Sequence, residues 1–148
     1  MILLDTNVLG RLTDSQDPQF AIARRAVYAL ISRSEQLVIV PQNLYEFWSV
    51  ATRQPGSPPS GQNGLGMTID QATLWLNFFQ RRFTLLVDME DLLQRWHQLV
   101  GTHAISGFRS HDARLVATMQ CYGIRNLLTF NGRHFGGFGI TIIDPDSI

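Results

Sequence analysis

The sequence predicts an α/β fold: a single three-layer domain in which a central, mostly parallel sheet of about five strands carries helices on both faces. Short, wholly apolar runs alternate along the chain with longer segments whose apolar residues recur at helical spacing. Such runs are typical of parallel strands that are covered on both faces. With 148 residues, 45% of them hydrophobic, the chain can form one substantial core. We therefore expect one domain spanning residues 1–148.

Two strands and two helices are expected in the first third of the chain. Residues 1–4 and 37–40 are apolar runs of strand length. A helix is predicted over residues 17–33, because Asp17 is followed by proline, a common first helical residue, and apolar residues then recur at helical spacing. A second helix is predicted over residues 41–52, where the large apolar residues share one face.

A mobile surface loop is expected at residues 54–66, which are rich in Pro, Gly, Ser and Asn and have no apolar period. Beyond it, Thr68 and Gln71 have the spacing of a capping box, in which each side chain accepts from the other residue's backbone N–H. This spacing predicts that a helix begins there. The apolar run at residues 83–87 predicts a third strand.

The last third of the chain completes the alternation. Asp88 is expected to cap a helix that ends near residue 101, and Ser110 to cap a helix over residues 111–122. Gly123 suits the left-handed position that ends many helices. Two final short strands are expected, at residues 126–128 and 140–143.

The composition indicates the cellular compartment of the protein and how its charges could bind nucleic acid. The formal net charge is zero, so any contact with nucleic acid has to come from a local cluster of its 12 basic residues, all of them arginine. The one cysteine, Cys121, cannot form an internal disulfide, which favours a reducing compartment. The apolar opening has no basic leader, and no apolar run reaches the roughly 20 residues of a membrane helix. We expect a cytoplasmic protein without a membrane segment.

Acidic and amide side chains occupy the positions where a parallel sheet binds ligands, beyond the carboxyl ends of its strands. Asp5 follows the first strand, and Thr129-Phe130-Asn131 follow the fourth. Glu46 lies between apolar neighbours in the helix after the second strand, and Asp112 lies in the first turn of the last long helix. Asp112 alone would be assigned to stabilising the helix dipole, by about 0.3–1 kcal/mol.

A metal ion would explain why three carboxylates meet. Two carboxylates about 4 Å apart repel by about 4 kcal/mol at an effective dielectric constant of about 20, so Asp5, Glu46 and Asp112 converge favourably only around a cation. Oxygen ligands without cysteine pairs favour Mg²⁺ or Mn²⁺ over zinc. Convergence is a hypothesis here, because spacing along the chain does not establish it.

Four motifs, in order along nearly the whole chain, resemble those of PIN domains and, among them, the VapC-type toxins of bacterial toxin–antitoxin pairs. They are Leu3-Leu4-Asp5-Thr6-Asn7, Pro41-Gln42-Asn43-Leu44-Tyr45-Glu46-Phe47, His111-Asp112-Ala113-Arg114-Leu115-Val116-Ala117 and Leu128-Thr129-Phe130-Asn131.

The resemblance implies a PIN-like fold and an endoribonuclease that uses Mg²⁺ or Mn²⁺ to hydrolyse RNA phosphodiester bonds with an activated water. It also implies a cognate antitoxin protein and a homodimer. Asp5, Glu46 and Asp112 correspond to metal-site acids. Asn131 stands where many relatives have a fourth acid; it is kept in the site as an outer ligand or a water-orienting group, and the number of metal ions stays open.

Further residues are candidates by their proximity to these motifs. Donors that could orient the acids are Thr6, Asn7 and Thr129, for which capping and turn roles are the alternative. Arginines that could bind RNA phosphates are Arg109, Arg114 and Arg133, for which a solvated surface position is the alternative.

Two other functions remain open from the residues alone. A phosphate-ester hydrolase of the haloacid-dehalogenase type would use Asp5 as its nucleophile, but that family needs a second Asp two residues later, where Asn7 stands. A catalytically silent module that binds RNA or protein is the other alternative, and the neutral Asn131 is the feature that favours it.

Overall fold

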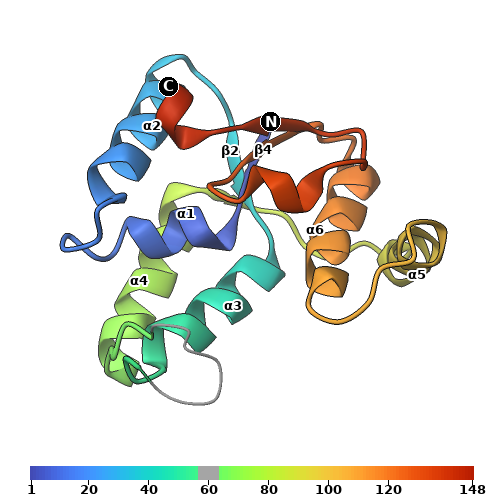
Figure 1. The fold of residues 1–148 in the computed structure, drawn as a ribbon. Helices are drawn as coiled ribbons and strands as arrows, with labels where there is room; N and C mark the ends of the chain where they lie inside the picture. Colours follow the sequence, from blue (N-terminus) through green and yellow to red (C-terminus); the bar gives the residue numbers. More distant parts are fainter. Residues whose placement is uncertain (57–63) are drawn as a thin grey trace.

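A computed structural model describes residues 1–56 and 64–148, so most of the loop predicted at 54–66 lies outside the described residues. Within the described residues, five strands form one parallel sheet in the order β3-β2-β1-β4-β5 (Figure 1). This arrangement confirms the predicted α/β class. The strands are β1 Ile2–Leu4, β2 Leu37–Ile39, β3 Thr84–Leu85, β4 Asn126–Leu128 and β5 Thr141–Ile143.

The central strand β1 positions the start of the candidate site. Its Ile2 pairs with Leu37 of β2 on one side and with Asn126 of β4 on the other. The backbone N–H of Asp5 donates to the carbonyl of Leu128 over 2.9 Å, which extends the pairing one residue beyond β1. Because all strands are parallel, their carboxyl ends lie at one edge of the sheet, and Asp5 lies at the middle of that edge.

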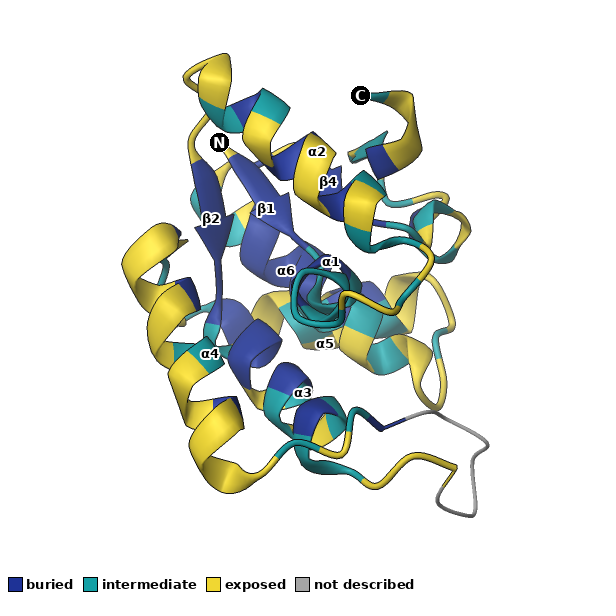
Figure 2. Ribbon diagram, turned by 90° about the vertical axis from the view of Figure 1, so that its left-hand side faces the viewer, coloured by how far each residue is buried: buried dark blue, intermediate teal, exposed yellow. Residues whose placement is uncertain are grey.

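Helices cover both faces of the sheet, as predicted. Within β1, Ile2 and Leu4 face a core built with α1 to α4, whereas Leu3 faces a second core built with α5 and α6. Figure 2 shows β1 and β2 buried between these layers and the outer side of α4 exposed. The helices are α1 Thr6–Arg11, α2 Phe20–Ser32, α3 Pro41–Thr52, α4 Ile69–Arg82, α5 Leu92–Thr102 and α6 Arg109–Tyr122, with the 3₁₀ turns η1 Gly132–Phe135 and η2 Pro145–Ser147. No helix in the described ranges is long and apolar enough to cross a bilayer.

Two predicted helix ends are confirmed in detail. At the start of α4, the Thr68 hydroxyl accepts from the Gln71 N–H and the Gln71 side chain accepts from the Thr68 N–H, over 3.1 and 3.0 Å. At the end of α6, Gly123 has φ +65°, in the left-handed region where a glycine carries no steric penalty. Both features depend on local sequence, which explains why they were predictable.

Three predicted helix starts are wrong. Asp17 does not cap α2, which begins at Phe20; its carboxylate accepts from the Gln19 N–H in the preceding turn. Asp88 does not cap α5, because its carboxylate pairs with Arg114 and the helix begins only at Leu92.

Ser110 does not cap α6 either. Gly107, at φ +63°, turns the chain, so α6 begins at Arg109 and the Ser110 hydroxyl donates back to the Gly107 carbonyl over 2.7 Å. The short helix α1, directly after Asp5, was not predicted. The predicted strands at 83–87 and 140–143 are shorter in the structure.

Candidate active site

One cleft of about 510 Å³ at the carboxyl edge of the sheet contains all four residues predicted to form the site. Its walls come from α1, α3, α6 and η1, which surround the end of β1 in Figure 1. The chain segments that supply them are far apart in sequence, and the parallel sheet brings them together. The predicted residues that line the cleft are Asp5, Thr6, Asn7, Glu46, Arg109, Asp112 and Asn131.

Asp5 enters the cleft because it joins β1 to α1. Its backbone is extended, at φ −77° and ψ 153°, and its carbonyl accepts from the N–H of Val8 over 3.0 Å, which begins the helix. The side chain makes no capping hydrogen bond to α1, so the carboxylate is left to face the cleft. The backbone of Asp5 therefore begins α1, and its carboxylate lines the cleft.

The Asp5 carboxylate is held by two of the three donors predicted for it, Asn7 and Thr129. The Thr129 hydroxyl donates to Oδ2 over 2.6 Å, and the Asn7 amide donates to the same atom over 2.8 Å. Burial raises the pKa of Asp5 to about 6; the charges of Glu46 and Asp112 also raise it, and the Thr129 hydrogen bond opposes them. The ionised form of Asp5 is therefore disfavoured unless a cation lies beside it.

Glu46 is held at both carboxylate oxygens. The Thr6 hydroxyl donates to Oε2 over 2.7 Å, and the Gln42 amide donates to Oε1 over 2.7 Å. Thr6 was predicted as a donor to Asp5, but its hydroxyl contacts Glu46. Gln42 lies one turn before Glu46 on α3, which begins with Pro41 directly after β2. The i, i+4 spacing could have revealed this partner from the sequence.

Asp112 faces two basic groups. Its Oδ2 lies 3.2 Å from Nε of Arg109, one turn earlier on α6, and 3.6 Å from Nδ1 of His134 on η1. A guanidinium nitrogen of Arg109 also donates to the His134 carbonyl. Burial raises the pKa of Asp112, and the charges of His134 and Arg109 oppose that shift.

Asn131 lies in the loop after β4, and its side chain is exposed at the cleft rim. Its backbone N–H donates to the Thr129 hydroxyl over 3.0 Å, and the neighbouring Phe130 N–H donates to Oδ1 of Asn7 over 3.3 Å. The loop is therefore tied to the same two residues that hold Asp5.

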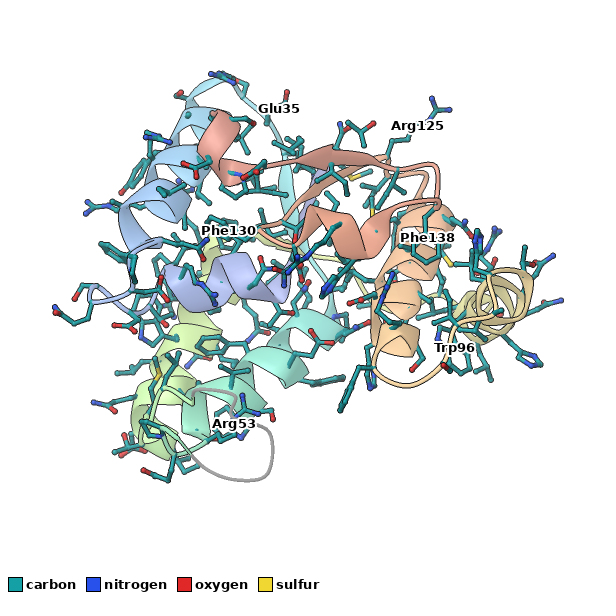
Figure 3. The ribbon with its side chains drawn as sticks, viewed as in Figure 1. Glu35, Arg53, Trp96, Arg125, Phe130 and Phe138 are labelled. Carbon is teal, nitrogen blue, oxygen red and sulfur yellow. The ribbon has the colours of Figure 1, made fainter. Side chains whose placement is uncertain are left out.

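The three predicted arginines are separated in the structure. Arg109 lines the cleft, Arg133 is exposed on η1 outside it, and Arg114 lines a different cavity. The sequence did not indicate two other arginines that line the cleft, Arg11 on the unpredicted α1 and Arg53 directly after α3. Arg53 is labelled in Figure 3.

The donor chemistry of the cleft fits a hard dication. Its potential ligands are the carboxylate oxygens of Asp5, Glu46 and Asp112 and the amide oxygen of Asn131, and hard cations prefer oxygen. The pKa of Asp5 is raised mainly by burial, and the charges of Glu46 and Asp112 add to that shift, so a bound cation would favour its ionised form. As the side chains stand, no three Asp, Glu, His or Cys residues of segments 1–56 and 64–148 are grouped to hold a metal ion.

A parallel five-stranded α/β domain with three acids at the carboxyl edge of its sheet is the class that this fold and cleft define. The family model of the PIN domain matches residues 2–136, a range that includes every predicted site residue. The chain therefore belongs to the PIN domain family. This membership favours the predicted nuclease family over the haloacid-dehalogenase alternative.

Solved structures share the fold over nearly the whole chain. VapC20 of Mycobacterium tuberculosis, described as a toxin that cleaves the sarcin–ricin loop, matches with a TM-score of 0.67 and 19% identity, over 95% of this chain and 97% of that one. A chain of the Rickettsia felis VapBC2 complex with promoter DNA matches with a TM-score of 0.68 and 14% identity, over 97% and 98%. A chain of a toxin–antitoxin complex from Klebsiella pneumoniae matches with a TM-score of 0.66 and 20% identity, over 98% of each. No curated protein sequence matched the chain.

Proposed function

We propose that this protein is a metal-dependent endoribonuclease and the toxin of a toxin–antitoxin pair. The observation that carries the proposal is the meeting of Asp5, Glu46 and Asp112 in one cleft at the carboxyl edge of the sheet. The RNA-cleaving activity in the description of VapC20 and the toxin–antitoxin complexes among the similar structures support it.

The three acids would hold Mg²⁺ or Mn²⁺, with Asn131 as an outer ligand or water-orienting group. When bound, the ion supplies a water of lowered pKa and neutralises charge on the phosphate. Thr129 and Asn7 fix the Asp5 carboxylate, and Thr6 fixes one oxygen of Glu46. Asp112, which pairs with Arg109 as the side chains stand, would be the third acid to hold the ion.

Arginines of the cleft would bind the RNA backbone. The molecule has a formal net charge of zero, so attraction to phosphates has to be local. Arg109 is the predicted arginine that lines the cleft, and Arg11 and Arg53 line it as well. Arg114 lines a different cavity.

Cleavage of RNA by the purified protein tests the proposal. Wild type should cleave a structured RNA with Mn²⁺, leaving 5′-phosphate and 3′-hydroxyl ends, and excess EDTA should stop it. Asp5→Asn and Asp112→Asn should lose cleavage and remain folded by circular dichroism. Asp70→Asn, which changes an exposed acid in the first turn of α4, is the matched control and should cleave like wild type. Cleavage in EDTA, or full activity in Asp5→Asn, would contradict the proposal.

An antitoxin would cover the exposed apolar side of α4. Ile69 and Leu74 are 60% and 69% exposed, and Leu74 lines a shallow hollow together with Trp75 and Phe78. Leu74→Asp should therefore abolish co-purification with the product of an adjacent antitoxin gene and leave RNA cleavage unchanged. Leu93→Asp, an equally exposed leucine on α5, is the control. The predicted homodimer is tested by light scattering of the toxin alone.

A further inference from the structure

Gln42 is a buried polar residue whose amide has three partners and joins α3 to α6. Its side chain on α3 is almost fully enclosed, with 6% of the residue exposed. The amide nitrogen donates to Oε1 of Glu46 over 2.7 Å and to the carbonyl of His111 on α6 over 2.9 Å. The amide oxygen accepts from Nη1 of Arg114 over 2.9 Å. Burying such an amide is favourable because each of its polar atoms has a partner.

The partners of Gln42 allow one orientation of its amide. A glutamate carboxylate and a backbone carbonyl only accept hydrogen bonds, and a guanidinium only donates them. A flipped amide would set its oxygen against Glu46 and its N–H groups against Arg114. Together with these two acceptors, Arg114 favours the orientation in which the Gln42 amide presents an N–H to Glu46.

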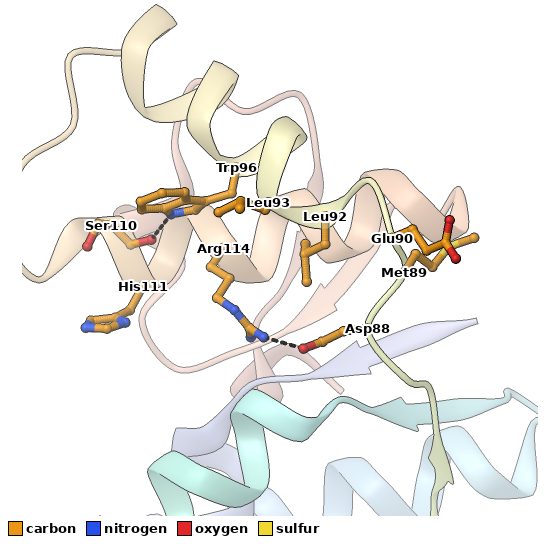
Figure 4. A pocket seen from close by; sticks show the side chains of 9 residues that line it. All are labelled: Asp88, Met89, Glu90, Leu92, Leu93, Trp96, Ser110, His111 and Arg114. Atoms are coloured by element: carbon orange, nitrogen blue, oxygen red, sulfur yellow. Dashed lines mark hydrogen bonds and ion pairs between the residues drawn. The ribbon is translucent and has the colours of Figure 1, made fainter.

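Arg114 is held by Asp88, which lies on the opposite side of Arg114 from Gln42 and the acidic cleft. Its Nη2 lies 2.6 Å from Oδ2 of Asp88, in the segment between β3 and α5. Figure 4 shows this ion pair at the wall of a second cavity of about 420 Å³, beside Leu92 and Trp96 of α5. The contacts Asp88–Arg114–Gln42–Glu46 form a continuous series from this cavity to the acidic cleft.

From these contacts we infer that Gln42 is a positioning residue for Glu46 and that Arg114, held by Asp88, fixes the orientation of Gln42. The inference rests on the proposed function, in which Glu46 is a metal ligand. A glutamate side chain has three rotatable bonds, so holding both of its oxygens restricts it to the conformation that faces Asp5 and Asp112. Arg114 thus serves the site through Gln42 and not through RNA.

Mn²⁺ calorimetry and cleavage kinetics on Gln42→Met test the inference. Methionine keeps the length of the side chain and removes both donors and the acceptor. The affinity for Mn²⁺ should fall by about 10- to 100-fold, as is typical when a partner of a metal ligand is removed. At saturating Mn²⁺ the cleavage rate should return to near the wild-type value. Gln80→Met is the matched control, because Gln80 also donates to a backbone carbonyl but lies exposed on α4.

A double-mutant cycle tests the role of Arg114. Arg114→Met alone should weaken Mn²⁺ binding, and adding it to Gln42→Met should cause no further loss, because both changes act through the same amide. Equal and additive losses would show that Arg114 acts on the ion or RNA independently, which overturns its role here. Arg114 is partly exposed, with 27% of its side chain accessible, so its variant keeps the test available if Gln42→Met does not fold.

Crystal structures of metal-free protein separate failure of the inference from failure of the proposed function. In Gln42→Met the Glu46 carboxylate should leave its wild-type position or occupy several. A Glu46 carboxylate unmoved in this variant, or unchanged Mn²⁺ affinity beside tight wild-type binding, would overturn the inference alone. A wild-type protein that neither bound Mn²⁺ nor cleaved RNA would contradict the proposed function and the inference with it.

Discussion

At Asp5, burial and the charges of Glu46 and Asp112 all oppose the ionised carboxylate. Two hydrogen bonds to one oxygen, from Thr129 and Asn7, only partly compensate. A buried acid of this kind destabilises the protein unless a cation joins it. The proposed cation would remove this cost at Asp5, and the cost can be measured in the metal-free protein.

The stability of the metal-free protein should depend on pH through Asp5. Its pKa in the folded state, about 6, lies above the ordinary value of 3.8. Between these values the native state binds more protons than the unfolded chain, so the free energy of unfolding should fall as the pH rises from about 4 to 7. The fall should approach about 3 kcal/mol. Urea unfolding in EDTA, followed by tryptophan fluorescence, measures it.

Asp5→Asn should remove most of this fall, because an amide does not titrate in this range. Asp112, whose pKa is also raised, contributes a residual slope in both proteins. Asp70→Asn should keep the wild-type profile. If the free energy of unfolding varied with pH in the same way in wild type and Asp5→Asn, the pKa of Asp5 would not be raised in the folded state, which contradicts the prediction.

Replacing Thr129 tests how much its hydrogen bonds contribute to stability and to the pKa of Asp5. Thr129 is fully buried; its hydroxyl donates to Asp5 and accepts from Asn7 and from the Asn131 N–H. Thr129→Val keeps the shape and removes the hydroxyl, so it should cost about 1–3 kcal/mol of unfolding free energy and raise the pKa of Asp5 further. Thr129→Ser keeps the hydroxyl and is the control. Carbon-detected NMR titration of Asp5 and urea unfolding measure both effects, and equal behaviour of the two variants would contradict the role of the hydroxyl.

At the scale of elements, the two ends of α6 differ in what they contribute. The first turn supplies Arg109 and Asp112 to the cleft, and Gly123 at the other end only terminates the helix. Gly107 lets the helix begin at Arg109, which places Asp112 in the first turn and Arg109 against it. The other end of the helix is far from the acids. Changes there should affect stability without affecting the site.

Gly123→Ala should lower the free energy of unfolding by about 1 kcal/mol, because the residue has φ +65° and alanine is strained there. A Cβ at this position would meet no atom within 4 Å, so the loss reports backbone conformation alone. Gly123→Asn should cost less, since asparagine tolerates this conformation better. Urea unfolding of the three proteins provides the measurement, with RNA cleavage unchanged throughout; an alanine variant as stable as wild type would contradict the expectation.

The wrong helix starts also belong to this scale. Asp88 has the residue type of a helix cap, yet it pairs with Arg114 of α6. Capping by a carboxylate and pairing with a distant guanidinium use the same oxygens, and local sequence does not reveal which partner wins. The capping box of Thr68 and Gln71 was predictable because both partners lie within four residues.

At the scale of the whole molecule, the cleft joins the end of β1 to α3 and α6. An ion bound by Asp5, Glu46 and Asp112 would link three segments that separate on unfolding. Binding of this kind stabilises the native state by about 2.7 kcal/mol at a ligand concentration of about 100 times Kd.

Mn²⁺ should therefore raise the Tm of the wild type relative to its Tm in EDTA. Asp5→Asn should show little or none of this shift, because it lacks one of the three carboxylates. Differential scanning calorimetry at fixed pH checks the prediction, with Asp70→Asn expected to follow the wild type. A Tm shift of equal size in Asp5→Asn would place the ion elsewhere.

The sequence by itself determined the α/β class and the order of most elements, and it supplied the candidate acids of the cleft. Apolar periodicity reports whether a segment has one or two covered faces, and this is a local property. Asp5 was a candidate because it follows a strand, Glu46 because apolar residues flank it within a helix, and Asp112 because it lies in the first turn of a helix.

Only the tertiary structure decided which side chains meet. The hydrogen bond from Thr129 to Asp5 joins residues 124 positions apart, and the one from Arg114 to Gln42 joins residues 72 apart. Such contacts depend on the order of strands in the sheet, which no local period contains. For this reason Arg109 and Arg114, close in sequence, line different cavities, and the contacts of Gln42 with His111 and Arg114 of α6 became visible only in the folded molecule.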